Sequence, residues 1–421
     1  MSTMPSDRTP DSTLAFLREG YRFVGDRCDR LGTDVFQTRL LLEPTICLRG
    51  REAAELFYDE ERFVRRGAMP VRGQRTLTGV GGVQGLDGQA HLVRKAMFMS
   101  IMTPTAIRRL GKIFDEQWRA QLQVWAGSGP VALYDEVGRI LTRTVWAWAG
   151  VPLAEADVPR RTAEMHAMIE APAAVGPRHW RGRLGRRHAQ RWAGELIERV
   201  RAGAVPAPEG SALAVVAGYR DERGLPLPRR IAAVELLNVL RPTVALDRYV
   251  VFAALALHDH PHWRDRLPGD DAATEQFVQE VRRYYPFFPV AAARVRRSFR
   301  WRGYAFPQGR RVLLDLYGTN HHPDVWPEPE RFRPERFAGW RDDPFGLVPQ
   351  GGGDHYTGHR CAGEWITIEL MKRAVTNLTG AMTYRVPPQD LALDLGAMPA
   401  LPPGGLVLDG IRPAEGVRPP R

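Results

Sequence analysis

A glycine-rich loop near the C-terminus, "PQGGGDHYTGHRCAGEW", carries the residues with the most specific chemistry. Cys361 stands just before an expected helix, where backbone N–H groups favour a thiolate. The glycines remove side-chain bulk, so that a flat group could approach the backbone. Three interpretations are open here: a small buried cysteine, a zinc site with His355, His359 and Cys361, or a thiolate that binds a metal or haem. The zinc interpretation lacks an obvious fourth ligand.

A second candidate lies within "ELLNVLRPTVALDRYVVF", which otherwise has the composition of a buried helix. Arg241 and Pro242 stand side by side there. A buried arginine needs a partner, and a proline inside a helix costs about 3 kcal/mol. No carboxylate stands three or four residues from Arg241 along the helix. Its partner is therefore either a residue of another element or an anionic ligand.

The elements that must position these residues are mostly helices. Helical patterns cover about residues 104–205 and 229–257, and further helices are expected in "ATEQFVQEVRRYY" and "GEWITIELMKRAVTNL". Alternation predicts a hairpin in "DVFQTRLLLEPTICLRG" and short strands in "RVRRSFRWRGYAF" and "RRVLLDLY". The expected fold class is mainly α with a minor β-sheet region, and no linker clearly separates domains.

The 421 residues carry a net charge of +11, much of it from arginine-rich segments such as "PRHWRGRLGRRHAQR". This excess could serve nucleic acid, an anionic surface or an acidic electron-transfer partner. No zinc-finger or RNP-like motif supports nucleic acid, and a solvated basic surface explains the charge more simply. Three cysteines without framework spacing argue against disulfides. Because signal and membrane-spanning runs are missing, we expect a cytoplasmic protein without a membrane anchor.

Four segments, in order and over nearly the full chain, resemble cytochromes P450. The cysteine loop resembles the haem-binding signature of that family, and "AHLVRK" falls where the family contacts the haem propionates. "EVRR" matches the E-x-x-R pair with Glu280 and Arg283, and "FRPERF" supplies Arg336 as the third member of that buried structural cluster. Each match alone is weak, since Glu–Arg pairs three residues apart are common on solvated helices.

More narrowly, the chain resembles the bacterial fatty-acid peroxygenase branch of this superfamily. The segments that carry the likeness are "GGVQGLDGQAH", "LRPTVA", "EVRRYYPFFP", "LLDLYGTNHHPDVWPEPERFRPERF" and "PQGGGDHYTGHRC". Two positions depart from the pattern. Ala362 stands where a proline often follows the cysteine, and Thr78 stands where the best-known members carry a phenylalanine near the haem.

The resemblance implies a cytochrome P450 fold with haem b between the long central helix and the cysteine-loop helix. It implies a single haem-thiolate catalytic domain over residues 1–421, with no reductase domain. Cys361 would be the axial ligand of the haem iron. His91, with Arg94 and Lys95, would hold the propionates, and the i, i+4 spacing places His91 and Lys95 on one helix face.

The resemblance also implies a reaction. Arg241 would bind the carboxylate of a long-chain fatty acid, and Pro242 would keep the helix bent and leave space above the iron. That carboxylate would serve as the acid–base group toward hydrogen peroxide, so that no redox partner is obligatory. Gln84 would lie on the distal side near substrate and haem, where glutamine is associated with hydroxylation and histidine with decarboxylation. The expected activity is hydroxylation at the alpha or beta carbon.

Other functions stay open. A conventional monooxygenase with an external redox partner would use the basic surface for docking, but the acid–alcohol pair of those enzymes is missing from "LRPTVALD". Decarboxylation of fatty acids to 1-alkenes would be a major side reaction of the same site. A haem-based sensor or carrier without turnover would not explain an arginine on the distal side.

Overall fold

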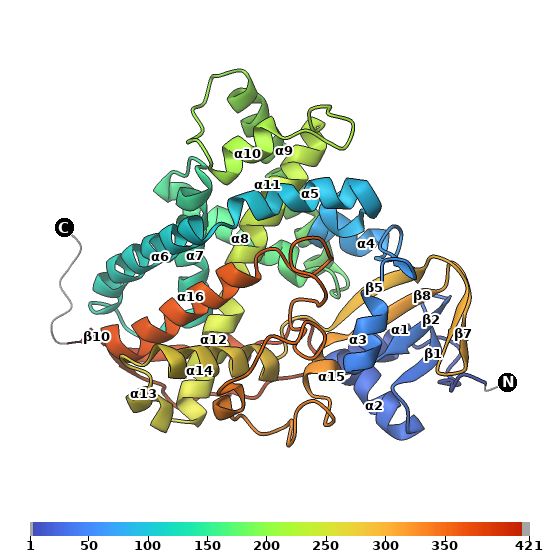
Figure 1. The fold of residues 1–421 in the computed structure, drawn as a ribbon. Coiled ribbons are helices and arrows are strands. Elements are labelled where there is room, and N and C mark those ends of the chain that lie inside the picture. The colour runs from blue at the N-terminus through green and yellow to red at the C-terminus, as the bar shows by residue number, and fades with distance from the viewer. Residues whose placement is uncertain (1–2, 415–421) are drawn as a thin grey trace.

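A computed structural model describes residues 3–414 and has the expected mainly α architecture (Figure 1). Helices fill one side of the molecule, and most of the strands lie together on the other side. The α-helices are α1 (Thr13–Glu19), α2 (Phe23–Leu31), α3 (Arg51–Phe57), α4 (Val71–Gly73), α5 (Gly88–Ile101), α6 (Pro104–Trp125), α7 (Leu133–Ala149), α8 (Val158–Glu170), α9 (Pro177–Arg201), α10 (Ala212–Gly218), α11 (Arg229–Val244), α12 (Asp247–Asp259), α13 (His262–Arg266), α14 (Asp271–Tyr284), α15 (Leu316–Asn320) and α16 (Glu364–Thr376).

The strands form three small sheets. They are β1 (Val35–Leu40), β2 (Glu43–Leu48), β3 (Phe63–Val64), β4 (Val131–Ala132), β5 (Val290–Val295), β6 (Phe299–Trp301), β7 (Tyr304–Phe306), β8 (Arg311–Asp315), β9 (Met382–Arg385) and β10 (Val407–Pro413). The largest sheet has the order β1-β2-β8-β5-β3, in which only β2 and β8 run parallel. The predicted hairpin is confirmed, because β1 pairs antiparallel with β2.

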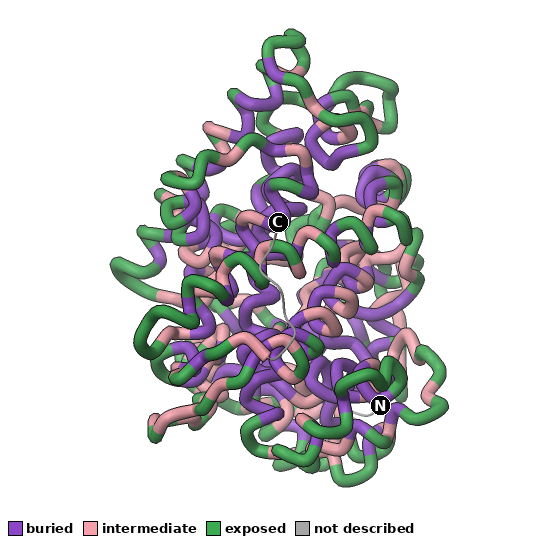
Figure 2. The backbone as a smooth tube through the Cα atoms, turned by 90° about the vertical axis from the view of Figure 1, so that its left-hand side faces the viewer, coloured by how far each residue is buried: buried purple, intermediate pink, exposed green. Residues whose placement is uncertain are grey.

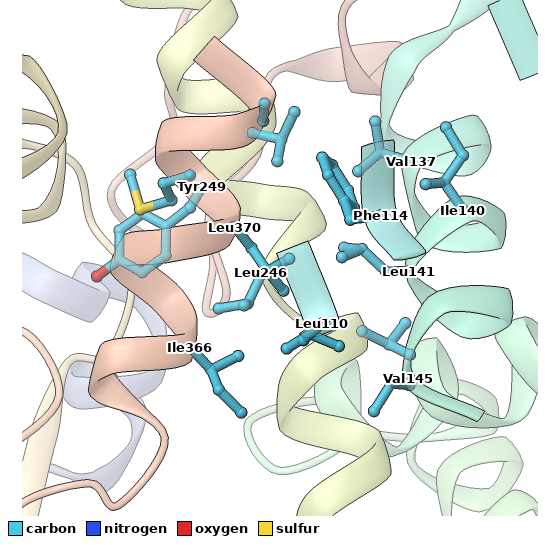
Figure 3. Packing of buried hydrophobic residues seen from close by; sticks show 14 of the residues in the cluster. Leu110, Phe114, Val137, Ile140, Leu141, Val145, Leu246, Tyr249, Ile366 and Leu370 are labelled. Carbon is cyan, nitrogen blue, oxygen red and sulfur yellow. The ribbon is translucent and has the colours of Figure 1, made fainter. Parts of the chain in front are cut away.

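The main core lies between α6, α7, α12 and α16 (Figure 3). Helix α6 shows why these residues form it: Thr103 caps its first turn by accepting from Ala106 N, and Pro104 fits the first helical position. Its buried residues recur at helical spacing, and Leu110 and Phe114 meet the other helices of the core. Burying one such side chain contributes about 1.5–3 kcal/mol.

The long central helix predicted over residues 229–257 is two helices, α11 and α12. Pro242 lies inside α11, but the break comes three residues later, where Ala245 N still donates to Arg241 O and Leu246 N donates to Thr243 O. The predicted helical stretch 104–205 is likewise divided into α6, α7, α8 and α9. Pro242 weakens α11, but the helix ends only where its last carbonyl groups find other hydrogen-bond donors.

Burial follows the layers of the fold. The inner helices are buried over most of their length, and exposed residues gather in the outer turns and loops (Figure 2). Within residues 3–414, no helix is long and apolar enough to cross a membrane.

Candidate functional site

Cys361 lies at the end of the glycine-rich loop, three residues before α16 begins. Its backbone N–H donates to Gln350 O at 3.2 Å, and its carbonyl accepts from Glu364 N at 3.3 Å. Burial raises the pKa of the Cys361 thiol, while the N–H of Gly363 and the charge of Lys95 lower it. The thiol is free. A bound metal ion would therefore be needed to favour the thiolate in this buried place.

Two glycines of this loop are needed for its own packing. Gly351 has a φ of +91°, and a Cβ atom there would lie 3.0 Å from Tyr58 Oη. A Cβ atom on Gly352 would overlap the carbonyl oxygen of Pro344. Their missing side chains face the protein, so these glycines let the loop fold tightly against Tyr58 rather than keep an open surface free.

The zinc site considered from the sequence does not form. Within residues 3–414, the His, Cys, Asp and Glu cluster with metal-like spacing is Glu60, His91 and His359, and the loop cysteine is not part of it. His355 stacks instead on Trp365, with 3.9 Å between the ring centroids. The cysteine is thus available as a single ligand.

A basic cluster lies beside the loop and consists of Arg65, His91, Lys95 and His359. The rings of His91 and His359 stack at 3.9 Å, and Nδ1 of His91 is buried without a hydrogen-bond partner, as is one terminal nitrogen of Arg65. Burial and the charge of Lys95 lower the pKa of His91 to about 4, and burial lowers that of Lys95 to about 8. Burial and the charges of Arg65, His91 and Lys95 also lower the pKa of His359. Arg65 and Lys95 supply positive charge, and the buried nitrogens of Arg65 and His91 without partners can donate, so the cluster fits the two propionates of a haem.

Two of the three residues expected at the propionates lie in this cluster, and the third points elsewhere. Arg94 NH1 donates to Glu235 Oε1 at 2.7 Å in a buried ion pair, which joins α5 to α11. Arg94 Nε has no partner. Lys95 Nζ also donates to the carbonyl of Arg360, next to the cysteine. The role of Arg94 toward haem, like that of His91, stays a prediction.

Arg241 is buried on α11 without a carboxylate partner. Its NH2 group donates to Asn238 Oδ1 at 3.4 Å, at the limit of a hydrogen bond, and its Nε has no partner. Burial and the charge of Arg186 lower the pKa of Arg241 to about 9, whereas Cys361 raises it. Arg241 is thus a buried cation without a carboxylate partner, which is suited to an anionic ligand.

Asn238 connects Gln84 to the ion pair of Arg94. Its Nδ2 donates to Glu235 Oε2 at 2.9 Å and lies 3.4 Å from Gln84 Oε1. Burial raises the pKa of Glu235 even though Arg94 and Asn238 act in the opposite direction. The polar chain from α5 to Gln84 was not predicted, although Glu235 and Asn238 stand out as polar residues in the apolar "ELLNVL".

Arg186 on α9 is a second buried cation that the sequence did not reveal. Its NH1 donates to Leu77 O at 2.8 Å, whereas its Nε and NH2 have no partners. Burial lowers the pKa of Arg186 to about 10, and Glu235 acts in the opposite direction. A Cβ atom on Gly79, whose φ is +82°, would overlap Arg186 NH2. Arg186 thus packs against the segment that carries Thr78.

Glu280 and Arg283 of the E-x-x-R motif form a separate cluster that does not include Arg186 or Arg241. Glu280 accepts from Arg283 Nε at 2.7 Å and from Arg336 Nε at 3.2 Å, and all three side chains are buried or nearly so. Arg283 NH1 also donates to Asn320 O at 3.1 Å. The cluster joins α14 to the segment before the cysteine loop, and its structural role stays a prediction.

The sequence analysis missed the neighbour of this pair. Arg282 forms a buried ion pair with Glu364, which also accepts from Arg360. Burial would raise the pKa of Glu364, but these arginines and His355 hold it well below its usual range. The pairing fixes the first turn of α16 to α14 and so positions the cysteine.

Comparisons with known proteins agree with this geometry. The family model for Cytochrome P450 matches residues 272–390. A structure of Cytochrome P450SP alpha (CYP152B1) in complex with (R)-ibuprophen has a TM-score of 0.94 and 49% identity, and the match covers 96% of this chain and 99% of that chain. Cytochrome P450EX alpha (CYP152N1) with myristic acid has a TM-score of 0.96 and 45% identity, covering 98% and 100%.

A more distant relative is Putative cytochrome P450 120 of Synechocystis sp., which is 24% identical and covers 90% of both chains. A structure of cytochrome P450 OleT with arachidonic acid is 36% identical, with a TM-score of 0.96 and coverage of 98% and 99%. The predicted P450 fold is therefore confirmed. The chain belongs to the cytochrome P450 superfamily and, within it, to the fatty-acid peroxygenase branch of P450SP alpha and P450EX alpha.

Proposed function

We propose that this protein hydroxylates long-chain fatty acids at the alpha or beta carbon with hydrogen peroxide. The observation that carries the proposal is Arg241, a buried cation with one long hydrogen bond and no carboxylate partner. A fatty-acid carboxylate supplies the missing anion. The relatives support this substrate class, since their structures were obtained with myristic acid and arachidonic acid.

The substrate carboxylate binds to Arg241 through charge-assisted hydrogen bonds. Such bonds are worth about 1.5–3 kcal/mol each, and the guanidinium can form two in parallel. Arg186 adds positive charge nearby and helps to keep the carboxylate ionised.

Cys361 would bind the iron of haem b, and His91, Lys95 and, we propose, Arg94 would hold its propionates; the bound haem-thiolate would supply the oxidation chemistry. The protein supplies the proton steps. The carboxylate on Arg241 moves a proton at the distal side, because the acid–alcohol pair of other members is replaced by Arg241 and Pro242. Peroxide then serves as oxidant without a redox partner.

Gln84 directs the outcome toward hydroxylation. Its amide is neutral over the working pH range and cannot relay a proton as histidine can. Gln84 is an exposed residue in the structure, and its Oε1 lies 3.4 Å from Asn238 Nδ2, which connects it to the helix that carries Arg241. Hydroxy acids are therefore the expected products, and 1-alkenes the minor ones.

The test is product analysis of the purified holoenzyme with myristic acid and peroxide, without reductant, by gas chromatography and mass detection. We expect 2- or 3-hydroxy acids in excess over 1-alkenes. Methyl myristate, which has no carboxylate, should react poorly. Activity only with reduced nicotinamide and electron-transfer proteins, or equal turnover of the methyl ester, contradicts the proposal. An excess of 1-alkenes contradicts the role of Gln84.

A further inference from the structure

Three segments that are distant in the sequence together form one basic surface on the side of the molecule where α9 and α11 lie. They are residues 71–83, 171–191 and 229–233, which together hold ten arginines and no Asp or Glu. Arg72 donates to the carbonyl of Ala174, and Arg230 NH1 donates to Val80 O at 3.0 Å. Helix α9 lies alongside α11 (Figure 1). The three segments are therefore neighbours, and we call their exposed residues the basic face.

The arginines of the basic face lack counter-ions. Apart from Arg229, which lies 3.9 Å from Glu195, none of these arginines forms an ion pair within the described residues 3–414. Some arginines elsewhere on the surface are paired, as Arg143 is with Glu155. Arg187, Arg191 and two neighbouring arginines line a cavity of about 330 Å³ that has no acidic side chain. A concentration of unpaired cations in one place attracts a polyanionic surface.

Large apolar side chains stand exposed among these cations. Val71, Val175, Trp180 and Leu184 are each more than half exposed, at 54%, 66%, 58% and 51%. Residues 180, 184, 187 and 191 share one face of α9 by helical spacing. That face is therefore apolar toward its N-terminal end and basic toward its C-terminal end. Water does not stabilise an exposed tryptophan and leucine on a basic helix, whereas a lipid interface buries such apolar side chains.

We infer that the basic face docks the protein on an anionic lipid surface. The arginines meet the lipid headgroups, and Trp180, Leu184 and the exposed valines enter the boundary between headgroups and acyl chains. Arg186, on the inner side of α9, contacts Leu77 O beside the distal pocket. Docking therefore brings the lipid phase, where a long-chain acid is concentrated, next to the wall of the substrate site. This last step rests on the proposed function, whereas docking itself does not.

The test is flotation of the holoenzyme with vesicles of phosphatidylcholine, with and without phosphatidylglycerol, at low and high salt. We expect binding to the anionic vesicles that weakens with salt. The triple variant Arg181→Gln, Arg187→Gln, Arg191→Gln should bind roughly a hundredfold more weakly, since each basic residue at such a surface contributes about a fivefold factor. Trp180→Ala should weaken the binding that persists at high salt.

The matched control removes the same charge elsewhere. The variant Arg109→Gln, Arg119→Gln, Arg412→Gln changes exposed residues of α6 and β10, and it should float like the wild type. Equal loss in both triple variants, wild-type binding that ignores phosphatidylglycerol, or tighter arginine-dependent binding to an RNA oligomer overturns the inference. Because vesicle binding needs no turnover, failure of docking and failure of the peroxygenase proposal are measured separately.

Discussion

Replacement of Arg241 by methionine should raise stability and weaken substrate binding at the same time. Burial and the charge of Arg186 lower the pKa of Arg241 from its ordinary value to about 9. At about 1.4 kcal/mol per pKa unit, the charged guanidinium costs roughly 5 kcal/mol more inside the protein than in water. The lost contact with Asn238 and the imperfect fit of methionine offset about 2–4 kcal/mol of this gain. The substrate-free holoenzyme should therefore gain about 1–3 kcal/mol in free energy of unfolding.

The same variant should bind fatty acid more weakly. Losing one charge-assisted hydrogen bond, at about 1.5–3 kcal/mol, already raises Kd by about 10- to 150-fold. Urea unfolding measures the stability, and titration of the haem absorption band with myristic acid measures Kd. Arg241→Lys is the matched control, because it keeps the charge and should keep the low stability with part of the affinity. A methionine variant that is less stable, or that binds with unchanged Kd, refutes the reasoning.

Three further predictions concern other parts of the molecule. Cys361→Ala should abolish the thiolate-type absorption band of the ferrous–CO complex while leaving the far-UV circular dichroism intact; an unchanged band excludes this ligand. Glu280→Gln leaves two buried arginines without their shared carboxylate and should cost about 3–5 kcal/mol in urea unfolding, whereas Glu328→Gln in an exposed ion pair should cost little. Burial raises the pKa of Asp315 to about 7, so the folded protein keeps a proton that the unfolded chain releases near 3.8. The free energy of unfolding should therefore fall as the pH rises between these two values. Asp315→Asn should flatten this fall, and a variant with the same pH profile as the wild type contradicts the prediction.

The parts of the site set by local spacing were predictable from the sequence. Glu280 and Arg283 are one helical turn apart, so their pairing follows from the helix itself. The hairpin of β1 and β2 follows from alternation and a turn. The role of Cys361 as a haem ligand stays a prediction, which rests on a loop, a helix and accompanying motifs that occur in the order of a known family.

The parts set by tertiary contacts were not predictable. Arg186 stands in a run of arginines, and only its place opposite Leu77 makes it buried and different from its neighbours. Arg94 has the type and spacing of a propionate ligand, yet its ion pair with Glu235 depends on how α5 meets α11. The end of α11 follows from the hydrogen bonds available around Ala245 rather than from the position of the proline.

The contact between Gly79 and Arg186 limits how this pocket can vary in evolution or in the laboratory. Any side chain at position 79 would need both a left-handed backbone and the space that a buried guanidinium occupies. Position 78, directly beside it, does not need a left-handed backbone: Thr78 ends the π-helical turn Gln74–Thr78, is buried, and places its hydroxyl 3.6 Å from the Met69 sulfur. Substitutions at position 79 should therefore be tolerated much less well than substitutions at position 78.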